Sequence, residues 1–217
     1  MLIPGTEIPI ELHEIVILGT GLAGMAAAVA ARQAGAEVLV LDKAPVTARS
    51  GNTRFSGGGF RAAHDGYDED AVFADHLKIT QGRANRELVE TMIVESRDTA
   101  DWLERLGVKW AHPDDRPDAA GYIWRFFYGG GQGMIEDLVA IAERLGVEIR
   151  YEHAGTELLL DGRGRVAGVR VQTPEGLRDF RADAVILATG GFQANPEMRV
   201  RYLGRFADAL IVRGTRY

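Results

Sequence analysis

The sequence predicts an α/β fold with a parallel central sheet, an antiparallel β-meander as a crossover and a helical insertion. An apolar run over 14–19, a helical stretch over 22–34 and a second apolar run over 37–41 follow one another, separated by glycine-containing turns. Further along, strand-like runs between 157 and 180 are separated by "DGRG" and "TPEG", which are typical of tight turns. Another apolar run over 184–188 predicts a last buried strand of the parallel core.

The glycines of the first turn have the spacing G-x-G-x-x-G, at Gly19, Gly21 and Gly24. Gly19 permits the tight turn, Gly21 allows the main chain to approach a pyrophosphate, and Gly24 allows helix and strand to pack closely. The N-terminus of the following helix offers N–H groups and a partial positive charge to phosphates. Asp42 ends the second strand, where a carboxylate accepts hydrogen bonds from ribose hydroxyls and disfavours the 2′-phosphate of NADP.

Residues 14–42 are therefore predicted to form a Rossmann-like βαβ unit that binds a dinucleotide. NAD and FAD share this fingerprint, so the unit alone does not distinguish them. The alternative is a helix–strand pair whose glycines are incidental. An ordinary NAD domain continues with further short βα repeats, whereas this chain enters the glycine-rich stretch "ARSGNTRFSGGGFRAA".

The middle of the chain is predicted to be mainly helical. Residues 43–68 are glycine-rich and predict an irregular loop, and residues 69–80 and 85–106 have helical periodicity. Residues 109–127 mix prolines, aspartates and aromatic residues and predict no element. The apolar stripe of the second helix is predicted at Leu88, Met92, Val94, Ala100, Leu103 and Leu106.

The remaining elements follow from glycine and proline signals. A helix is predicted over 133–145 and a strand over 147–151, before the meander. A last helix is predicted to begin at Pro196 with Asn195 as its N-cap, because asparagine and proline favour these two positions.

Composition excludes several classes of protein. The net charge of −6 argues against a general binder of nucleic acid or of an anionic membrane, which needs a basic face. The chain has no cysteine, so it holds no disulfide, CxxC redox pair or iron–sulfur cluster of its own. It shows neither a signal peptide nor an apolar run near the roughly 20 residues that span a bilayer. We expect a cytoplasmic protein that is not an integral membrane protein.

Four stretches, in this order, resemble the fumarate reductase/succinate dehydrogenase flavoprotein family (FAD-dependent oxidoreductase 2 type). They are "VILGTGLAGMAAAVAARQAGAEVLVLDKAP", "SGNTRFSGGGFRA", "GGGQGMIEDLVAIAERLGVEIRYEHAGTELLLDGRGRVAGVRV" and "AVILATGGFQANPEMRVRYLG". They span nearly the whole chain, and within the family they most resemble tricarballylate dehydrogenase-like members. The resemblance implies an FAD-binding domain over residues 1–217, which is the N-terminal part of a longer enzyme whose cap and C-terminal segment are absent.

The resemblance also implies how the domain is divided and what it does. The βαβ unit (14–42) would be followed by a flavin loop (43–68), a helical insertion (69–128) and the remainder of the FAD domain (129–217). The implied reaction is hydride transfer between flavin and a small carboxylate such as tricarballylate, fumarate or succinate. Implied partners are a C-terminal partner chain or an iron–sulfur or haem electron-transfer subunit. A stand-alone FAD-binding or electron-transfer module, and an inactive truncated remnant, remain as alternatives.

The cofactor-binding residues implied by the motif and the resemblance come from five segments of the chain. They are Gly19, Gly21, Leu22, Ala23, Gly24, Asp42, Lys43, Ala44, Ser50, Gly51, Asn52, Thr53, Ser56, Gly57, Gly58, Gly59, Gly155, Ala188, Thr189, Gly190 and Gly191. Covalent-flavin relatives carry a histidine in the loop that here reads Ser50-Gly51-Asn52, so non-covalent FAD is expected. The alternatives are a glycine-rich surface loop over 50–59, an ordinary strand position at Gly155 and a plain turn over 189–191.

No catalytic residue and no metal ligand is nominated. The histidines His13, His64, His76, His112 and His153 have no metal-binding spacing and are more simply explained as surface or loop residues. Arg54, Arg61 and Arg125 have the charge to bind an anionic substrate, although solvent-exposed arginines are commoner. The segment Gly129–Gly133 has two possible explanations, a phosphate-facing turn or only the start of a helix.

Overall fold

The computed structural model describes residues 8–63, 67–114 and 122–217. The chain divides into two compact units, residues 1–55 with 138–217 and residues 56–137. We call these the first unit and the second unit. The division falls within the helix α4 (Gly130–Arg144).

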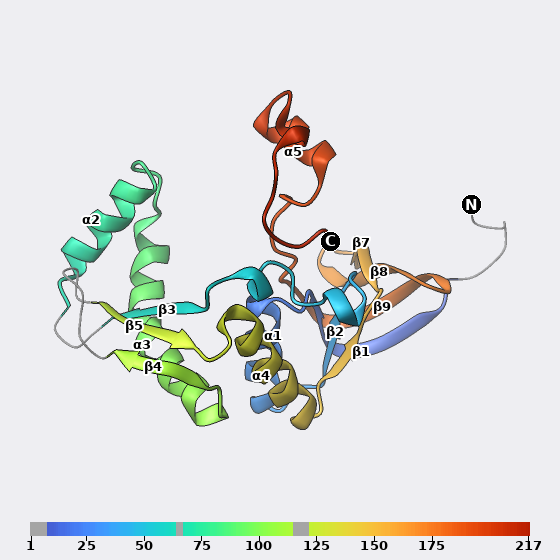
Figure 1. Cartoon of the computed structure of the whole chain (residues 1–217). Helices are drawn as coiled ribbons and strands as arrows, with labels where there is room; N and C mark the ends of the chain where they lie inside the picture. The colour runs from blue at the N-terminus through green and yellow to red at the C-terminus, as the bar shows by residue number, and fades with distance from the viewer. Residues whose placement is uncertain (1–7, 64–66, 115–121) are drawn as a thin grey trace. The chain divides into compact units, whose positions relative to one another are not determined.

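The first unit is built on a six-stranded sheet with the order β6-β2-β1-β9-β8-β7 (Figure 1). Neighbouring strands from β6 to β9 run parallel, and those from β9 to β7 run antiparallel. This confirms the predicted mixed α/β fold with a parallel core and an antiparallel meander. The strands are β1 (Ile10–Leu18), β2 (Val38–Leu41), β6 (Glu148–Arg150), β7 (Ala154–Leu160), β8 (Val166–Thr173) and β9 (Gly176–Leu187).

The helix α1 (Leu22–Gln33) connects β1 to β2, as the sequence predicts. Its alanine-rich sequence favours a helix, and it buries Met25, Ala28 and Val29. The helix ends before Gly35, whose φ of +96° belongs to the left-handed region that glycine adopts without strain. The main core of the sheet contains Val16, Leu18, Leu39, Leu41, Val169, Val171 and Phe180.

The strand β9 differs from the prediction. The segments 177–180 and 184–188, predicted as separate strands, belong to one strand that pairs in parallel with β1 from Asp179 to Leu187. The polar residues between them resemble a break in the sequence, but they lie in a partly exposed part of the sheet that tolerates polar side chains. The predicted burial of 184–188 is wrong as well, because Leu187 is 59% exposed at the end of the strand.

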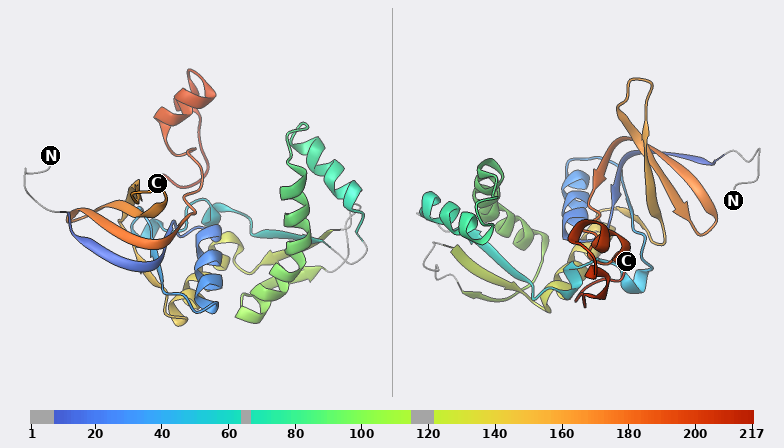
Figure 2. Two further views of the ribbon diagram at one scale, coloured as in Figure 1. Left: turned by 180° about the vertical axis from the view of Figure 1, so that it is seen from behind. Right: turned by 90° about the horizontal axis from the view of Figure 1, so that it is seen from above.

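The second unit contains a three-stranded antiparallel sheet with the order β3-β5-β4. Its strands are β3 (Gly59–Ala63), β4 (Trp110–Asp114) and β5 (Tyr122–Phe127), and its helices are α2 (Glu69–Ile79) and α3 (Arg86–Leu106). The helix α3 crosses one face of this sheet in both Figure 1 and Figure 2. The sequence predicted both helices but none of these strands.

The buried face of α3 is not the predicted one. The helix buries Val89, Ile93, Ser96, Ala100 and Leu103, which are spaced alternately by four and three residues. Ala100 and Leu103 were predicted correctly, whereas the predicted Leu88, Met92 and Val94 are 69%, 49% and 57% exposed. A second apolar row beside the true one misled the prediction, because sequence alone does not show which row meets the sheet.

The last helix, α5 (Pro196–Leu203), begins where the sequence predicts. The Oδ1 atom of Asn195 accepts a hydrogen bond from the backbone N–H of Met198, which is the geometry of an N-cap. Among residues 8–63, 67–114 and 122–217, no helix is long and apolar enough to cross a membrane.

Candidate functional site

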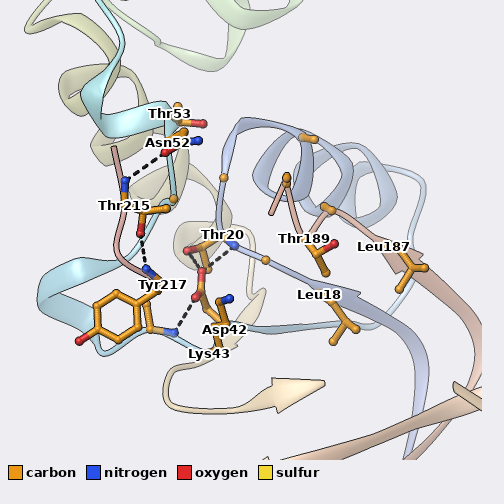
Figure 3. Close-up of a pocket in the computed structure, with 18 of the residues that line it drawn as sticks. Leu18, Thr20, Asp42, Lys43, Asn52, Thr53, Leu187, Thr189, Thr215 and Tyr217 are labelled. Carbon is orange, nitrogen blue, oxygen red and sulfur yellow. Dashed lines mark hydrogen bonds between the residues drawn. The ribbon is translucent and has the colours of Figure 1, made fainter. Parts of the chain in front are cut away.

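A cavity of about 640 Å³ lies in the first unit where the strands β1, β2 and β9 end (Figure 3). Ligands of parallel α/β sheets bind at the carboxyl ends of the strands, and pockets for small molecules measure roughly 300–1,000 Å³. The cavity is lined by Leu18, Gly19, Thr20, Gly21, Leu22, Ala23, Leu41, Asp42, Lys43, Ala44, Gly51, Asn52, Thr53, His153, Gly155, Leu187, Ala188, Thr189, Gly190, Gly191, Gln193, Thr215 and Tyr217.

The three motif glycines have distinct surroundings in the structure. Gly19 has φ +109°, and a Cβ atom there would lie 2.4 Å from the carbonyl oxygen of Ala188. A Cβ atom on Gly24 would lie 1.9 Å from the carbonyl oxygen of Gly19, so the helix and the turn pack backbone to backbone. For Gly21 the nearest atom would be the Thr53 Oγ1 atom at 3.5 Å, which leaves open space on the cavity side. These surroundings match the roles of turn, close packing and ligand approach that the motif predicts.

The Asp42 carboxylate is buried, with 8% of the residue exposed, and organises the turn between β1 and α1. Its Oδ2 atom accepts hydrogen bonds from the backbone N–H of Thr20, at 2.9 Å, and from the Thr20 hydroxyl. Its Oδ1 atom accepts from the backbone N–H of Ala44 at 2.8 Å. A carboxylate has about four acceptor positions, so one remains for a ligand hydroxyl.

The loop over 50–53 packs against the same turn. Ser50 is fully buried with φ +80°, and its backbone N–H donates to the Thr20 hydroxyl at 2.9 Å. Its own hydroxyl is buried and has no hydrogen-bond partner within the part of the chain that the structure describes. The Thr53 hydroxyl accepts from the backbone N–H of Leu22 at 3.0 Å, at the first turn of α1. These hydrogen bonds hold small residues and the Thr53 hydroxyl around the start of α1, and a helix N-terminus with little side-chain bulk around it suits a pyrophosphate.

Most of the predicted site residues line this cavity, but six do not. Gly24 packs against the backbone of Gly19, and Ser50 donates from its backbone N–H to the Thr20 hydroxyl. Both therefore support the turn that lines the cavity without lining it themselves. The remaining residues, Ser56, Gly57, Gly58 and Gly59, belong to the second unit.

The sequence missed eight residues that line the cavity: Leu18, Thr20, Leu41, His153, Leu187, Gln193, Thr215 and Tyr217. Thr20 lies inside the glycine motif, and Leu18 and Leu41 end the two strands that flank it, so their positions carried a signal. Thr215 and Tyr217 carry no motif, and only the fold brings them to the cavity.

The glycines of the second unit bring two pieces of backbone together. Gly58 has φ +72°, and a Cβ atom there would lie 2.6 Å from the carbonyl carbon of Gly130. The backbone N–H of Gly131 donates to the carbonyl oxygen of Ser56 at 3.1 Å, and that of Phe127 donates to Gly58 at 2.9 Å. Gly130–Gly133 are the first residues of α4, so the interpretation of this stretch as a helix start is supported.

The three arginines considered as substrate ligands are engaged within the chain. Arg54 donates to the carbonyl oxygen of Thr47 at 2.8 Å. The Arg61 guanidinium lies 3.8 Å from the centre of the Tyr122 ring and forms an ion pair with Asp75. Arg125 faces two acidic residues of α3, Asp101 and Glu104.

Two of the histidines whose side chains are described make local contacts with backbone oxygens. The Nδ1 atom of His76 lies 2.9 Å from the carbonyl oxygen of Val72, and that of His153 lies 2.7 Å from the carbonyl oxygen of Tyr151. His64 and the side chain of His112 lie outside the described residues. Within 8–63, 67–114 and 122–217, no group of three or more His, Cys, Asp or Glu residues is arranged to hold a metal ion.

Comparison with known families connects this geometry to a cofactor. The sequence profile of the family described as "FAD binding domain" matches residues 14–213. The chain belongs to this family. Its cofactor is FAD, which resolves the ambiguity between NAD and FAD that the glycine motif left open.

Individual relatives confirm the resemblance to the fumarate reductase/succinate dehydrogenase flavoproteins. The chain is 31% identical over 201 residues to a fumarate reductase (cytochrome) of Shewanella frigidimarina, covering 87% of this chain and 35% of the relative. It is 32% identical over 202 residues to an L-aspartate oxidase of Caulobacter vibrioides, covering 86% of this chain and 39% of that protein. The chain thus spans little more than a third of the length of each of these two relatives.

A solved structure supports the same assignment. The open conformation of a flavocytochrome c3 fumarate reductase superposes with a TM-score of 0.78 at 28% sequence identity, covering 89% of this chain and 36% of that chain. The fold described above is therefore that of an FAD-binding flavoprotein domain.

Proposed function

We propose that this chain is the FAD-binding part of an oxidoreductase that transfers a hydride between the flavin and a small carboxylate substrate of the tricarballylate, fumarate or succinate type. One observation carries the proposal: the cavity at the ends of β1, β2 and β9 gathers the glycine turn, Asp42 and the loop over 50–53. The names of two relatives, a fumarate reductase and an L-aspartate oxidase, support a carboxylate substrate.

The residues of this cavity have separate tasks in the proposed site. Gly21 and the first turn of α1 would hold the pyrophosphate, and the remaining acceptor position of Asp42 would bind a ribose hydroxyl. Ser50, which does not line the cavity, would act through the Thr20 hydroxyl to which its backbone N–H donates. Bound FAD supplies the hydride chemistry, and the protein supplies binding, orientation and exclusion of water.

We further propose that FAD is held non-covalently, because Ser50, Gly51 and Asn52 stand where covalent-flavin relatives carry a histidine. The predicted division into a flavin loop (43–68), a helical insertion (69–128) and the remainder of the FAD domain (129–217) is part of the same proposal.

The partners in this proposal are a C-terminal partner chain, which would supply substrate ligands, or an electron-transfer subunit with iron–sulfur or haem centres, which would exchange electrons with the flavin. The chain itself has no cysteine to hold an iron–sulfur cluster. The cytoplasmic location stays a prediction.

The test is the visible absorption spectrum of the purified chain before and after FAD addition and desalting. We expect flavin bands that survive desalting and are released into solution when the protein is denatured with acid, because no covalent bond holds the cofactor. A protein that stays colourless at every FAD concentration contradicts the proposal and favours the inactive remnant. Flavin that remains attached after acid denaturation contradicts the non-covalent assignment alone.

A further inference from the structure

The segment Arg213–Tyr217 forms part of the cavity although no sequence motif marks it. Thr215 and Tyr217 line the cavity together with Asn52, which belongs to the loop over 50–53 (Figure 3). The sequence analysis places Asn52 among the cofactor-binding residues. In the structure its side-chain oxygen also has a partner within the chain.

The amide of Asn52 holds the backbone of this segment. Its Oδ1 atom accepts a hydrogen bond from the backbone N–H of Thr215 at 3.0 Å. A Cβ atom on Gly214 would lie 2.3 Å from the same oxygen, and Gly214 has φ +156°, so glycine allows the close approach. The Thr215 hydroxyl in turn accepts from the backbone N–H of Tyr217 at 3.1 Å, which continues the contact along the segment.

The chain that leads into this segment is fixed from another side. Arg199 of α5 is buried, and its guanidinium donates to the carbonyl oxygens of Asp208 at 3.0 Å and Leu210 at 2.9 Å. Hydrogen bonds to a charged donor are stronger than neutral ones. The chain is therefore held by Arg199 at Asp208 and Leu210, ahead of the segment, and by Asn52 at Thr215 within it.

The segment borders the cavity without filling it. With Thr215 and Tyr217 in place the cavity still measures about 640 Å³, which lies within the range of ligand sites. A segment that blocked the site would have to be displaced before a ligand entered. This segment instead lines a cavity that stays open.

We propose that Asn52 is a positioning residue that holds Arg213–Tyr217 as a wall of the FAD site, so that Thr215 and Tyr217 contact the bound cofactor. This inference rests on the proposed function, because the wall acts on FAD affinity only where FAD occupies this cavity. The two amide N–H donors of Asn52 remain free of this hydrogen bond, which engages only its oxygen.

The first experiment measures how firmly the segment is held, with no cofactor present. Arg213 is exposed, so trypsin cleavage after it reports release of the segment, and cleavage after Arg163 in the exposed β7–β8 turn serves as the internal reference. Asn52→Ala removes the acceptor, and Thr215→Pro removes the donor together with the hydroxyl that accepts from Tyr217. Asn52→Ala is expected to raise the cleavage rate at Arg213 about three- to tenfold, as for the loss of one hydrogen bond, and Thr215→Pro at least as much, with no change at Arg163.

The second experiment measures the dissociation constant for FAD in the same variants by titration. Asn52→Ala is expected to weaken binding about three- to tenfold and Thr215→Pro at least as much, and the double variant no more than Thr215→Pro alone, because that variant has already lost the hydrogen bond between Asn52 and Thr215. FAD is expected to slow cleavage at Arg213 in the wild-type protein. Asn85→Ala is the matched control, since the Asn85 Oδ1 atom also accepts from a backbone N–H, that of Leu88, but in the second unit.

The outcomes separate the wall from the proposed function. If the wild-type protein binds FAD but Asn52→Ala leaves both affinity and cleavage unchanged, the wall is contradicted and FAD binding stands. Tighter FAD binding by Asn52→Ala overturns the wall in favour of a segment that blocks the site. If the wild-type protein does not bind FAD at all, the proposed function itself is contradicted.

Discussion

Each unit of the molecule contains a glycine-rich turn: Gly19–Gly24 leads into α1 in the first unit, and Ser56–Gly59 leads into β3 in the second. The sequence analysis treated Gly21 and Ser56–Gly59 alike, as places where backbone approaches a cofactor. In the first unit, Gly21 faces a cavity and a Cβ atom there would have room. In the second unit, the space beside Gly58 is filled by the backbone of Gly130 and Gly131.

The comparison shows that a glycine-rich turn has two physical uses which look the same in a sequence. Absence of a side chain can leave room for a ligand, or it can let two backbones meet. What a Cβ atom would contact distinguishes the two uses, and that depends on segments far away in the chain. Gly24 shows that both uses occur inside one motif, because it packs against Gly19 while Gly21 faces the cavity.

The largest effect is expected for Gly24→Ala. A Cβ atom would lie 1.9 Å from the carbonyl oxygen of Gly19 and 3.3 Å from the Cβ atom of Ala188, so α1 and the turn must move apart. We expect a loss of about 3 kcal/mol or more in the free energy of unfolding, measured by urea denaturation. Gly162→Ala is the control, since nothing lies within 4 Å of a Cβ atom there, and it should change stability by less than about 0.5 kcal/mol. Equal effects of the two substitutions would show that Gly24 is not needed for close packing.

Gly58→Ala is the corresponding change in the second unit. The added methyl would meet the backbone of Gly130 at 2.6 Å, and φ +72° adds strain, so a loss of about 2 kcal/mol is expected. Hydrogen exchange measures it locally, because the backbone N–H of Phe127 donates to Gly58 and should lose protection. Gly82→Ala separates backbone strain from steric contact, because Gly82 has φ +79° but a Cβ atom there would have nothing within 4 Å. It should lower the free energy of unfolding by about 1 kcal/mol. Weaker FAD binding with unchanged stability in Gly58→Ala would instead support the cofactor contact predicted from the sequence.

The sequence predicted well the features that are determined by neighbouring residues. The limits of α1, the N-cap at Asn195 and the tasks of Gly19 and Gly24 follow from signals within a few residues of each other, and the structure agrees with them. The buried row of α3 was mispredicted from Leu88 to Val94, because two apolar rows compete and only contact with the β3-β5-β4 sheet decides between them.

Features that depend on distant partners escaped prediction. The strand β5 is aromatic and charged, and its pairing with β3 joins residues about 60 apart in sequence, from Gly59 and Phe126 to Ala63 and Tyr122. Thr215 meets Asn52 across 163 positions with no motif at either residue. The same distance in sequence explains why the hydrogen bond between Asn52 and this segment was not predicted, while the cofactor contact of Asn52 stays a prediction.

Gly21→Ala examines the side of the motif that faces the ligand. Gly21 has φ −69°, which alanine adopts, and the nearest atom to its Cβ would be the Thr53 Oγ1 atom at 3.5 Å. Stability should therefore change by less than about 0.5 kcal/mol, while FAD affinity falls about tenfold because the methyl group occupies cavity space. Titration with FAD and urea denaturation of the same samples measure both effects. A loss of stability like that of Gly24→Ala would remove the distinction between the two positions.

The smallest effect is expected for a substitution of Glu11, which lies in β1 and does not line the cavity. A substitution there changes ion pairs of the side chain and not close contacts between backbones. Its carboxylate accepts from Arg150 at 2.7 Å and from Arg178 at 2.5 Å, joining β1 to β6 and β9. Burial alone would raise the pKa of Glu11, but the hydrogen bonds from Arg178 and Arg150 lower it to about 2 from an ordinary value of 4.5. Because the pKa is lower in the folded state, the stabilisation is complete above pH 4.5 and is lost as the pH falls towards 2.

Glu11→Gln should therefore cost about 1 kcal/mol at neutral pH, and less as the pH falls from 4.5 towards 2, as measured by urea denaturation at each pH. FAD affinity at neutral pH should stay unchanged, because Glu11 does not line the cavity. Glu157→Gln is the control, since that carboxylate pairs with Arg170 at 3.2 Å but is 59% exposed and should have a smaller effect. If Glu11→Gln weakened FAD binding as much as Gly21→Ala, FAD affinity would depend on the charges around β1 as well as on the glycine turn. The different surroundings of the glycines would then not be enough to explain FAD binding.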